Sequence, residues 1–296
     1  MIMLRYQIYR RVGLCASAIA LTATVIGVTG CNVFTTETQS TQPATQTTQL
    51  TKLTVTSGSS TAPLLTALIT VFKPPKNAIA VNELPASQSE SALAGLKNGD
   101  IHLVMTSSTL PTDDASIKQQ NFAKDGLLVA VHPSVTGVTN LTTQQLQDIY
   151  SGKTTNWKDF GGPDAAIVVL DRPEDESAKR LLRKHYLGKN LPNAAKAIVL
   201  RKETELIKAI QITPYSIGAF SLSQALTQQL PVQHLSLNGI KPAIETVETG
   251  KYPMVRSVTL AFKSPVSEPV QQFLDFAYGS AGQEVLRKNH YSPVKL

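Results

Sequence analysis

Two short loops rich in hydroxyl residues are the first places where this sequence could hold a ligand. Residues 57–63 read Ser-Gly-Ser-Ser-Thr-Ala-Pro, and residues 86–92 read Ala-Ser-Gln-Ser-Glu-Ser-Ala; each precedes an apolar helical pattern. Small residues ahead of a helix leave backbone N–H groups unpaired at the positive end of the helix dipole. Both loops therefore predict an anion cradle, with Ser60, Thr61, Ala62 and Ser89 as candidate ligand-binding residues. Ordinary helix capping by Ser and Thr is the alternative interpretation.

Arg172 follows a third apolar run and offers the rigid, bidentate fork that suits an oxyanion. An ion pair with Asp171 or Glu174 is its alternative role. The acids 174–176 stand at the start of a helix, where they complement the helix dipole. If Glu176 points inward, it competes with a bound anion; if it points to solvent, the loop backbone stays available.

The sequence contains no set of residues that indicates catalysis or metal binding. The five histidines have no metal-ligand spacing, and no nucleophile elbow, phosphate-binding Gly-Lys-Ser/Thr loop or pair of catalytic carboxylates is present. Lys and Arg form no run interleaved with aromatic residues, which argues against a nucleic-acid partner. The expectation is a binding protein without metal or cofactor.

Short apolar runs alternate with helical patterns along the chain, which predicts an α/β fold. The predicted strands lie at 53–56, 101–105, 127–131, 167–170, 217–220 and 258–262. Thr142 and Gln145 form a capping-box pattern, and Gly152 is suited to end that helix. The length of 296 residues and the 42% hydrophobic content suffice for two lobes held together by packing.

The first thirty residues have the pattern of a secretory signal peptide: three arginines followed by 17 residues without charge. Val28-Thr29-Gly30-Cys31 resembles a bacterial lipobox, which implies lipidation of Cys31; a plain signal peptide is the alternative. Residues 31–51 are rich in Thr and Gln and predict a flexible tether. Removing the signal takes away three arginines and no acids, so the formal net charge falls from +7 to +4.

Several longer stretches resemble the periplasmic phosphate-binding proteins of bacterial ABC transporters. They are SGSSTAPLL (57–65), GLKNGDIHLVMTSSTL (95–110), TNLTTQQLQDIYSGKTTNWKDFGGPDAAIVVLDR (139–172), SIGAFSLSQA (216–225) and ETGKYPMVRSVTLAFK (248–263). The resemblance implies a type II periplasmic-binding-protein fold, with two α/β lobes, two crossing strands near 127–131 and 258–260, and a ligand cleft between the lobes. Lobe 1 would comprise 52–128 and 259–296, and lobe 2 would comprise 129–258.

The resemblance also implies which residues hold the ligand. Thr61, Ser89 and Arg172 match phosphate-contacting residues of the family. The family's acidic residue falls at Ser107, where this chain has no carboxylate. The family's Gly-Ser-Gly-Thr turn falls at 175–178, so Glu176, Ser177 and Ala178 occupy its donor positions.

The expected protein is thus an exported, monomeric solute-binding lipoprotein. It would capture inorganic phosphate or a related oxyanion for an ABC permease, anchored through Cys31 in the periplasm or on the outer face of the cell membrane. The changes at Ser107 and 175–178 leave a second reading open, a degenerate homologue that acts as a scaffold or a sensor partner.

Overall fold

The computed structural model describes residues 50–74 and 78–294. The predicted signal peptide, Cys31 and all but the last two residues of the predicted tether lie outside these described residues. The last tether residue, Thr51, is already the first residue of strand β1. Among the described residues, no helix combines the length and apolarity that a membrane crossing requires.

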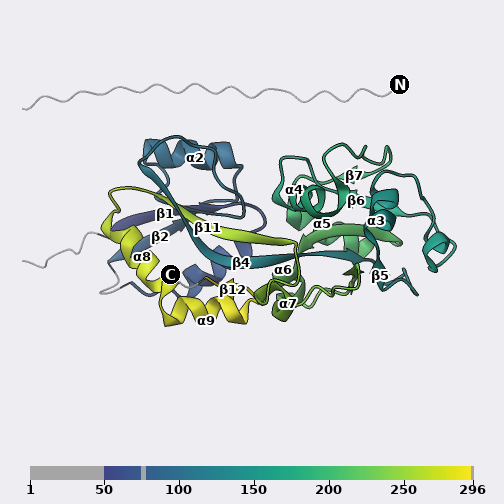
Figure 1. The fold of residues 1–296 in the computed structure, drawn as a ribbon. Coiled ribbons are helices and arrows are strands. Elements are labelled where there is room, and N and C mark those ends of the chain that lie inside the picture. The colour runs from purple at the N-terminus through teal and green to yellow at the C-terminus, as the bar shows by residue number, and fades with distance from the viewer. Residues whose placement is uncertain (1–49, 75–77, 295–296) are drawn as a thin grey trace, which may run out of the picture. The chain divides into compact units, whose positions relative to one another are not determined.

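One group of elements comes from both ends of the described chain, and we call it the first lobe (Figure 1). Its elements are β1 (Thr51–Ser57), α1 (Ala62–Val71), β2 (Ile79–Glu83), α2 (Ser89–Asn98), β3 (Leu103–Thr106), α8 (Glu268–Tyr278), α9 (Ser280–Lys288) and β12 (Ser292–Pro293). Helices α1, α8 and α9 pack on one face of its strands and α2 on the other. The strands follow this division, because Leu103 and Met105 face the first set of helices whereas Val104 faces α2.

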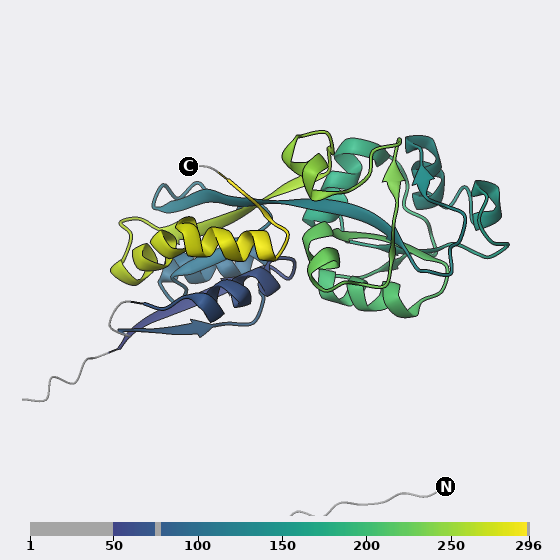
Figure 2. The same cartoon turned by 90° about the horizontal axis from the view of Figure 1, so that it is seen from below.

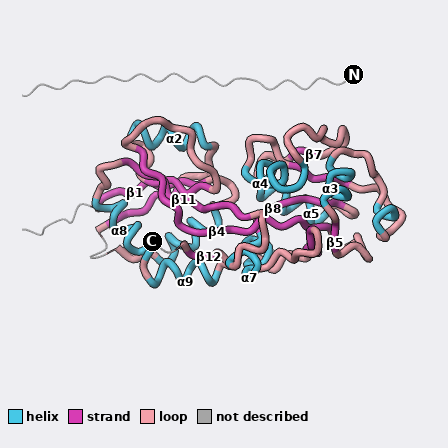
Figure 3. The backbone as a smooth tube through the Cα atoms, viewed as in Figure 1, coloured by secondary structure: helices cyan, strands magenta, loops and turns pink. Residues whose placement is uncertain are grey.

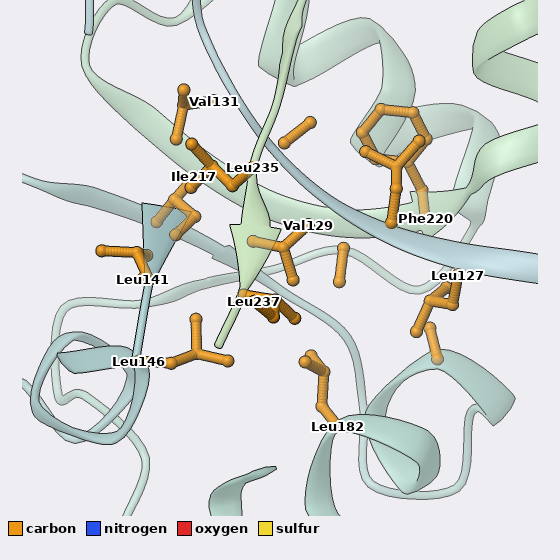
Figure 4. Close-up of a cluster of buried hydrophobic side chains, with 14 of the residues drawn as sticks. Leu127, Val129, Val131, Leu141, Leu146, Leu182, Ile217, Phe220, Leu235 and Leu237 are labelled. Atoms are coloured by element: carbon orange, nitrogen blue, oxygen red, sulfur yellow. The ribbon is translucent and has the colours of Figure 1, made fainter. Parts of the chain in front are cut away.

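The second lobe is formed by the middle of the chain. Its elements are β5 (Asn140–Leu141), α3 (Thr143–Tyr150), η2 (Trp157–Phe160), β6 (Val168–Asp171), α4 (Ser177–Leu182), η3 (Arg183–Leu187), β7 (Ile198–Val199), α5 (Glu203–Ile212), β8 (Ser216–Ser221), α6 (Leu222–Thr227), β9 (Gln233–His234), β10 (Ser236–Leu237) and α7 (Ile244–Glu248). Its core is a large apolar cluster that includes Leu127, Val129 and Phe220 of the strands and Leu182 of α4 (Figure 4).

Two long antiparallel strands, β4 (Ile117–Val131) and β11 (Val255–Lys263), run between the lobes in both views of the ribbon (Figures 1 and 2). They join the strands of both lobes into one sheet in the order β2-β1-β3-β11-β4-β8-β6-β7, and β9 and β12 also pair with β4. The tube drawing shows this continuous path of strands (Figure 3). The two-lobed α/β fold expected from the resemblance is confirmed.

The two crossing strands also divide the apolar core. In β4, Phe122 and Ala123 belong to the core of the first lobe, whereas Leu127 onward belongs to that of the second. The pairing of β4 with β11 shifts register between Val258 and Thr259. The predicted lobe boundary at 258/259 falls at this bulge, and the other, at 128/129, falls inside β4. The boundaries themselves stay predictions.

Local sequence signals place several elements correctly. All six predicted strands overlap observed ones. The predicted capping box is present, since the Thr142 hydroxyl accepts from the Gln145 backbone and the Gln145 side chain accepts from Thr142 N–H. Gly152 follows α3 with a φ of 76°, a conformation that glycine adopts at little cost.

Candidate functional site

A cavity of about 260 Å³ lies between the two lobes and is bounded by the starts of several helices. Its lining residues from the first lobe are Gly58, Ser59, Ser60, Ala62, Pro85, Ala86, Ser87, Gln88, Ser89, Thr106, Ser107 and Ser108, and those from the second lobe are Glu176, Lys202 and Thr204. The lining is dominated by small and hydroxyl side chains, with one carboxylate and one ammonium group. This composition suits a small polar ligand.

Five of the predicted ligand-binding residues line this cavity: Ser60, Ala62, Ser89, Ser107 and Glu176. The two hydroxyl-rich loops, which are separated by about thirty positions in the sequence, thus face one space. They do so because β1 is parallel to its neighbours β2 and β3, so their carboxyl ends meet at one edge of the sheet.

The remaining four predicted residues do not line the cavity. Thr61 is buried, and its hydroxyl donates to the backbone oxygen of Met105 over 2.9 Å. Ala178 packs in the core of the second lobe. Ser177 lies behind Ser107, with 3.1 Å between their hydroxyl oxygens. Arg172 is separated from the cavity by Glu176.

The start of α1 has fewer free donors than the sequence suggested. The backbone N–H groups of Thr61 and Ala62 both donate to the carbonyl of Gly58 at 3.1 Å, and Pro63 has no N–H group. The loop closes on itself as a tight turn, so two of the expected cradle donors are already used.

The Arg172 guanidinium is paired with Glu176, rather than with Asp171 or Glu174 as its alternative role supposed. Nη2 of Arg172 lies 2.8 Å from Oε2 of Glu176, and Nη1 donates to the backbone oxygen of Leu200 over 2.9 Å. The Arg172 side chain is 2% exposed and that of Glu176 is 21% exposed. Glu176 therefore points inward, which is the orientation that competes with a bound anion.

The two neighbouring acids point away from the cavity. Glu174 binds Arg183 and Asn193, and the hydrogen bond from Arg183 lowers the pKa of Glu174 to about 2. Asp175 is largely exposed and lies 3.5 Å from Arg201. Only one of the three acids at the start of α4 therefore affects the cavity directly.

Several contacts hold the two lobes together around the cavity. Ser60 and Ser107 share a hydrogen bond of 2.8 Å within the first lobe. Ser107 then meets Ser177 of the second lobe, and Arg180 donates to the hydroxyl of Ser108 over 2.7 Å. Gln224 donates to the backbone oxygen of Ser60 over 2.9 Å. The cavity is thus enclosed by polar contacts between the lobes.

A buried ionic cluster lies behind the cavity, and no local pattern in the sequence indicates it. Arg256 of β11 contacts Asp125 of β4 at 2.8 Å and Glu203 of α5 at 2.9 Å, and it also donates to Ser177. Burial alone would raise the pKa of Glu203, but the charge of Arg256 outweighs it and the pKa lies below its ordinary value. The same carboxylates raise the pKa of Arg256 despite its burial. Glu203 and Arg256 are therefore both ionised at neutral pH.

Lys202 and Thr204, at the start of α5, were also missed as cavity residues. The sequence does contain a local sign that a helix starts here. Glu203 and Glu205 lie in the first turn of α5, a position that favours acidic residues. No local signal could have shown that this helix start faces the first lobe.

Comparisons with known proteins agree on one group. A family model described as a PBP superfamily domain matches residues 41–281. The phosphate-binding protein PstS of Borreliella burgdorferi is 28% identical over 249 residues, which cover 80% of this chain and 88% of that protein. PstS of Bacillus subtilis is 27% identical over 246 residues and covers 81% and 80%, respectively.

A solved structure gives the same result for the fold. It is described as a substrate-binding protein of a phosphate ABC transporter from Clostridium perfringens, with bound phosphate. It superposes with a TM-score of 0.72 at 25% sequence identity, and the match covers 82% of this chain and all of the other.

Proposed function

This chain belongs to the PBP superfamily, and we propose that it is an exported solute-binding protein that captures inorganic phosphate, or a related oxyanion, for an ABC transporter. The observation that supports this most directly is the cavity between the lobes, which is lined by hydroxyl groups and helix starts. The names of the relatives in Borreliella and Bacillus support phosphate as the ligand. Both relatives are named as binding proteins, and the present protein likewise acts by binding rather than by catalysis.

The ligand would be held without forming any covalent bond. Ser60, Ser89 and Ser107 offer hydroxyl donors, Lys202 offers an ammonium group, and Arg172 is the guanidinium behind Glu176. Hydrogen bonds to a charged oxyanion are stronger than those between neutral groups, so a few such donors suffice for tight binding. Hinge closure of the two lobes over β4 and β11 would enclose the ion.

Isothermal titration calorimetry with phosphate, sulfate and a nucleotide tests this proposal. We expect phosphate to bind, and Arg172→Ala to weaken binding by about tenfold or more, the loss typical of a charged hydrogen-bond donor. Arg287→Ala, which removes an arginine of α9 bonded to Gln283, is the matched control and should leave the affinity unchanged. Ser89→Ala provides a milder second variant in case Arg172→Ala does not fold. Heat from none of the three ligands would contradict the proposal.

A degenerate homologue without a ligand is the second candidate, and one observation favours it. Glu176 occupies the guanidinium that would otherwise meet the anion, and Ser107 supplies no carboxylate. Such a scaffold or sensor partner should give no heat with any anion. Micromolar binding of phosphate by the unmodified chain would exclude it.

We also propose that lipidated Cys31 anchors the protein to a membrane as a monomer that meets its permease there. The support is the sequence alone: the signal-like first thirty residues, the lipobox-like Val28-Thr29-Gly30-Cys31 and the following tether. Two or more acyl chains would hold the protein firmly, whereas one would bind only marginally. In a host that processes lipoproteins, the chain should partition into the detergent phase of Triton X-114. Cys31→Ser should move it to the aqueous phase; detergent partitioning of this variant would contradict lipidation at Cys31.

A further inference from the structure

Glu176 stands between the buried Arg172 guanidinium and the ligand cavity. Its carboxylate lines the cavity and lies 2.8 Å from Nη2 of Arg172, whereas Arg172 itself contributes nothing to the cavity wall. The Arg172 guanidinium therefore faces a carboxylate of its own chain and not the cavity. An anion in the cavity would meet that carboxylate before it reached the guanidinium.

The Arg172 guanidinium is only partly satisfied by this arrangement. Nη1 donates to Leu200 and Nη2 to Glu176, but Nε is buried and has no hydrogen-bond partner among the described residues. Nε–H and one N–H of Nη2 lie on the same edge of the guanidinium and together match two oxygens of one oxyanion. Glu176 contacts Nη2 alone and leaves Nε without a partner. A buried donor without a partner is costly, so a ligand with two suitable oxygens has an advantage over Glu176.

The Glu176 side chain is free to leave without disrupting its helix. Glu176 is the N-cap residue of α4, yet its side chain makes no capping hydrogen bond. It also lines a second, more open cavity of about 640 Å³, and the cations of that cavity are Arg180 and Arg201. Both arginines are exposed, but the acids Glu90 and Asp175 line the same cavity. A displaced Glu176 carboxylate would therefore be stabilised by pairing directly with one of the two guanidinium groups.

We propose that Glu176 is an internal competitor for the oxyanion: it holds Arg172 in the empty protein and is displaced toward Arg180 and Arg201 when the ligand binds. This inference rests on the proposed function, since it assumes that the cavity takes an oxyanion. Exchange of Glu176 for the ligand converts a single contact on the guanidinium edge into a two-point contact. Glu176 thereby sets the affinity of the cleft and restricts it to anions that can make both contacts.

The test is to measure phosphate and sulfate affinities by calorimetry for the unmodified chain and for two variants. Glu176→Gln removes the charge and keeps the shape, and Glu176→Ser removes the whole carboxylate arm. We expect both variants to bind phosphate at least about tenfold more tightly than the unmodified chain, as removal of a close charged competitor should. Glu248→Gln is the matched control, because it removes one negative charge from an exposed residue at the end of α7 that lines neither cavity.

The possible outcomes separate this inference from the proposed function. If the unmodified chain binds phosphate and Glu176→Gln leaves the affinity unchanged, the internal competitor is wrong and the proposed function stands. If Glu176→Gln weakens phosphate binding but strengthens sulfate binding, Glu176 accepts a hydrogen bond from the O–H group of protonated phosphate, which also overturns the inference. If only the variants bind, Glu176 blocks the site and does not yield to the ligand, so both the proposed exchange and phosphate capture by the unmodified chain are wrong. If no form binds while circular dichroism shows all of them folded, both fail.

Discussion

Arg256 contacts two buried carboxylates that come from different parts of the chain, Asp125 of the crossing strand β4 and Glu203 at the start of α5. All three side chains are at most 3% exposed. Removing one member of a buried ion pair leaves an uncompensated charge, which typically costs about 3–5 kcal/mol. We expect Arg256→Met to lower the free energy of unfolding in urea by about that amount. Lys288→Met, which removes an exposed pair with Glu284, should have almost no effect.

The pH dependence of the same variant gives an independent check. Since the folded-state pKa of Glu203 lies below 4.5, its ionised form stabilises the protein above that pH, and the contribution is lost as the pH falls through the lowered pKa. Without Arg256 this pKa should rise, so the variant should lose less stability on acidification than the unmodified chain. Equal losses for both proteins would contradict the assigned role of Arg256.

The residues of the cavity differ in how far the sequence could reveal them. Hydroxyl-rich turns before helices are local patterns, so Ser60 and Ser89 could be found by inspection. Arg256 and its partners are separated by 53 and 131 positions, and no local pattern connects them. The orientation of Glu176 was equally out of reach, because it depends on Arg172 being buried with its guanidinium toward that side chain.

A helix or strand could be predicted from the sequence where the residues that determine it lie close together in the chain. The start of α3 depends on two hydrogen bonds between Thr142 and Gln145, so its capping box was visible in the sequence. Helix α4, which begins at Ser177, continues directly into a short π-helix, Arg183–Leu187, that ends at Gly188. That change in winding has no local signature that the sequence analysis could use. The conformation of the turn before α1 was not predictable either, because it depends on the backbone N–H groups of Thr61 and Ala62 donating to the carbonyl of Gly58.

The arrangement of the elements required more than local patterns. Alternating apolar runs and helical patterns give an α/β class but not the order of strands in a sheet. Strand β11 lies in the sheet between β3 and β4, and both of these strands precede it by more than a hundred residues in the chain. This position returns the C-terminal part of the chain to the first lobe. The resemblance to a known family implied that path, whereas composition and periodicity alone could not.

At the scale of the whole described body, two apolar cores share one sheet. β4 contributes Phe122 to the first core and Leu127 to the second. Asp125 and Arg256 lie on the two crossing strands, and Arg256 also pairs with Glu203 of α5. Unfolding of one lobe would strip hydrogen-bond partners from both crossing strands and expose buried charges. The lobes should therefore unfold together, although proteins with two cores often show separate transitions.

We expect a single transition in scanning calorimetry of the chain, with a calorimetric enthalpy close to the van't Hoff enthalpy. Phosphate at 100 times its Kd should stabilise the folded state by about 2.7 kcal/mol and move the whole transition upward, since residues of both lobes line the proposed site. The matched control is sodium chloride at the same ionic strength, which should shift the transition much less. Two resolved transitions, or a shift of only part of the heat-absorption peak, would mean that the crossing strands do not couple the lobes. In that case phosphate would be held by one lobe, and closure over the cavity would contribute little to its affinity.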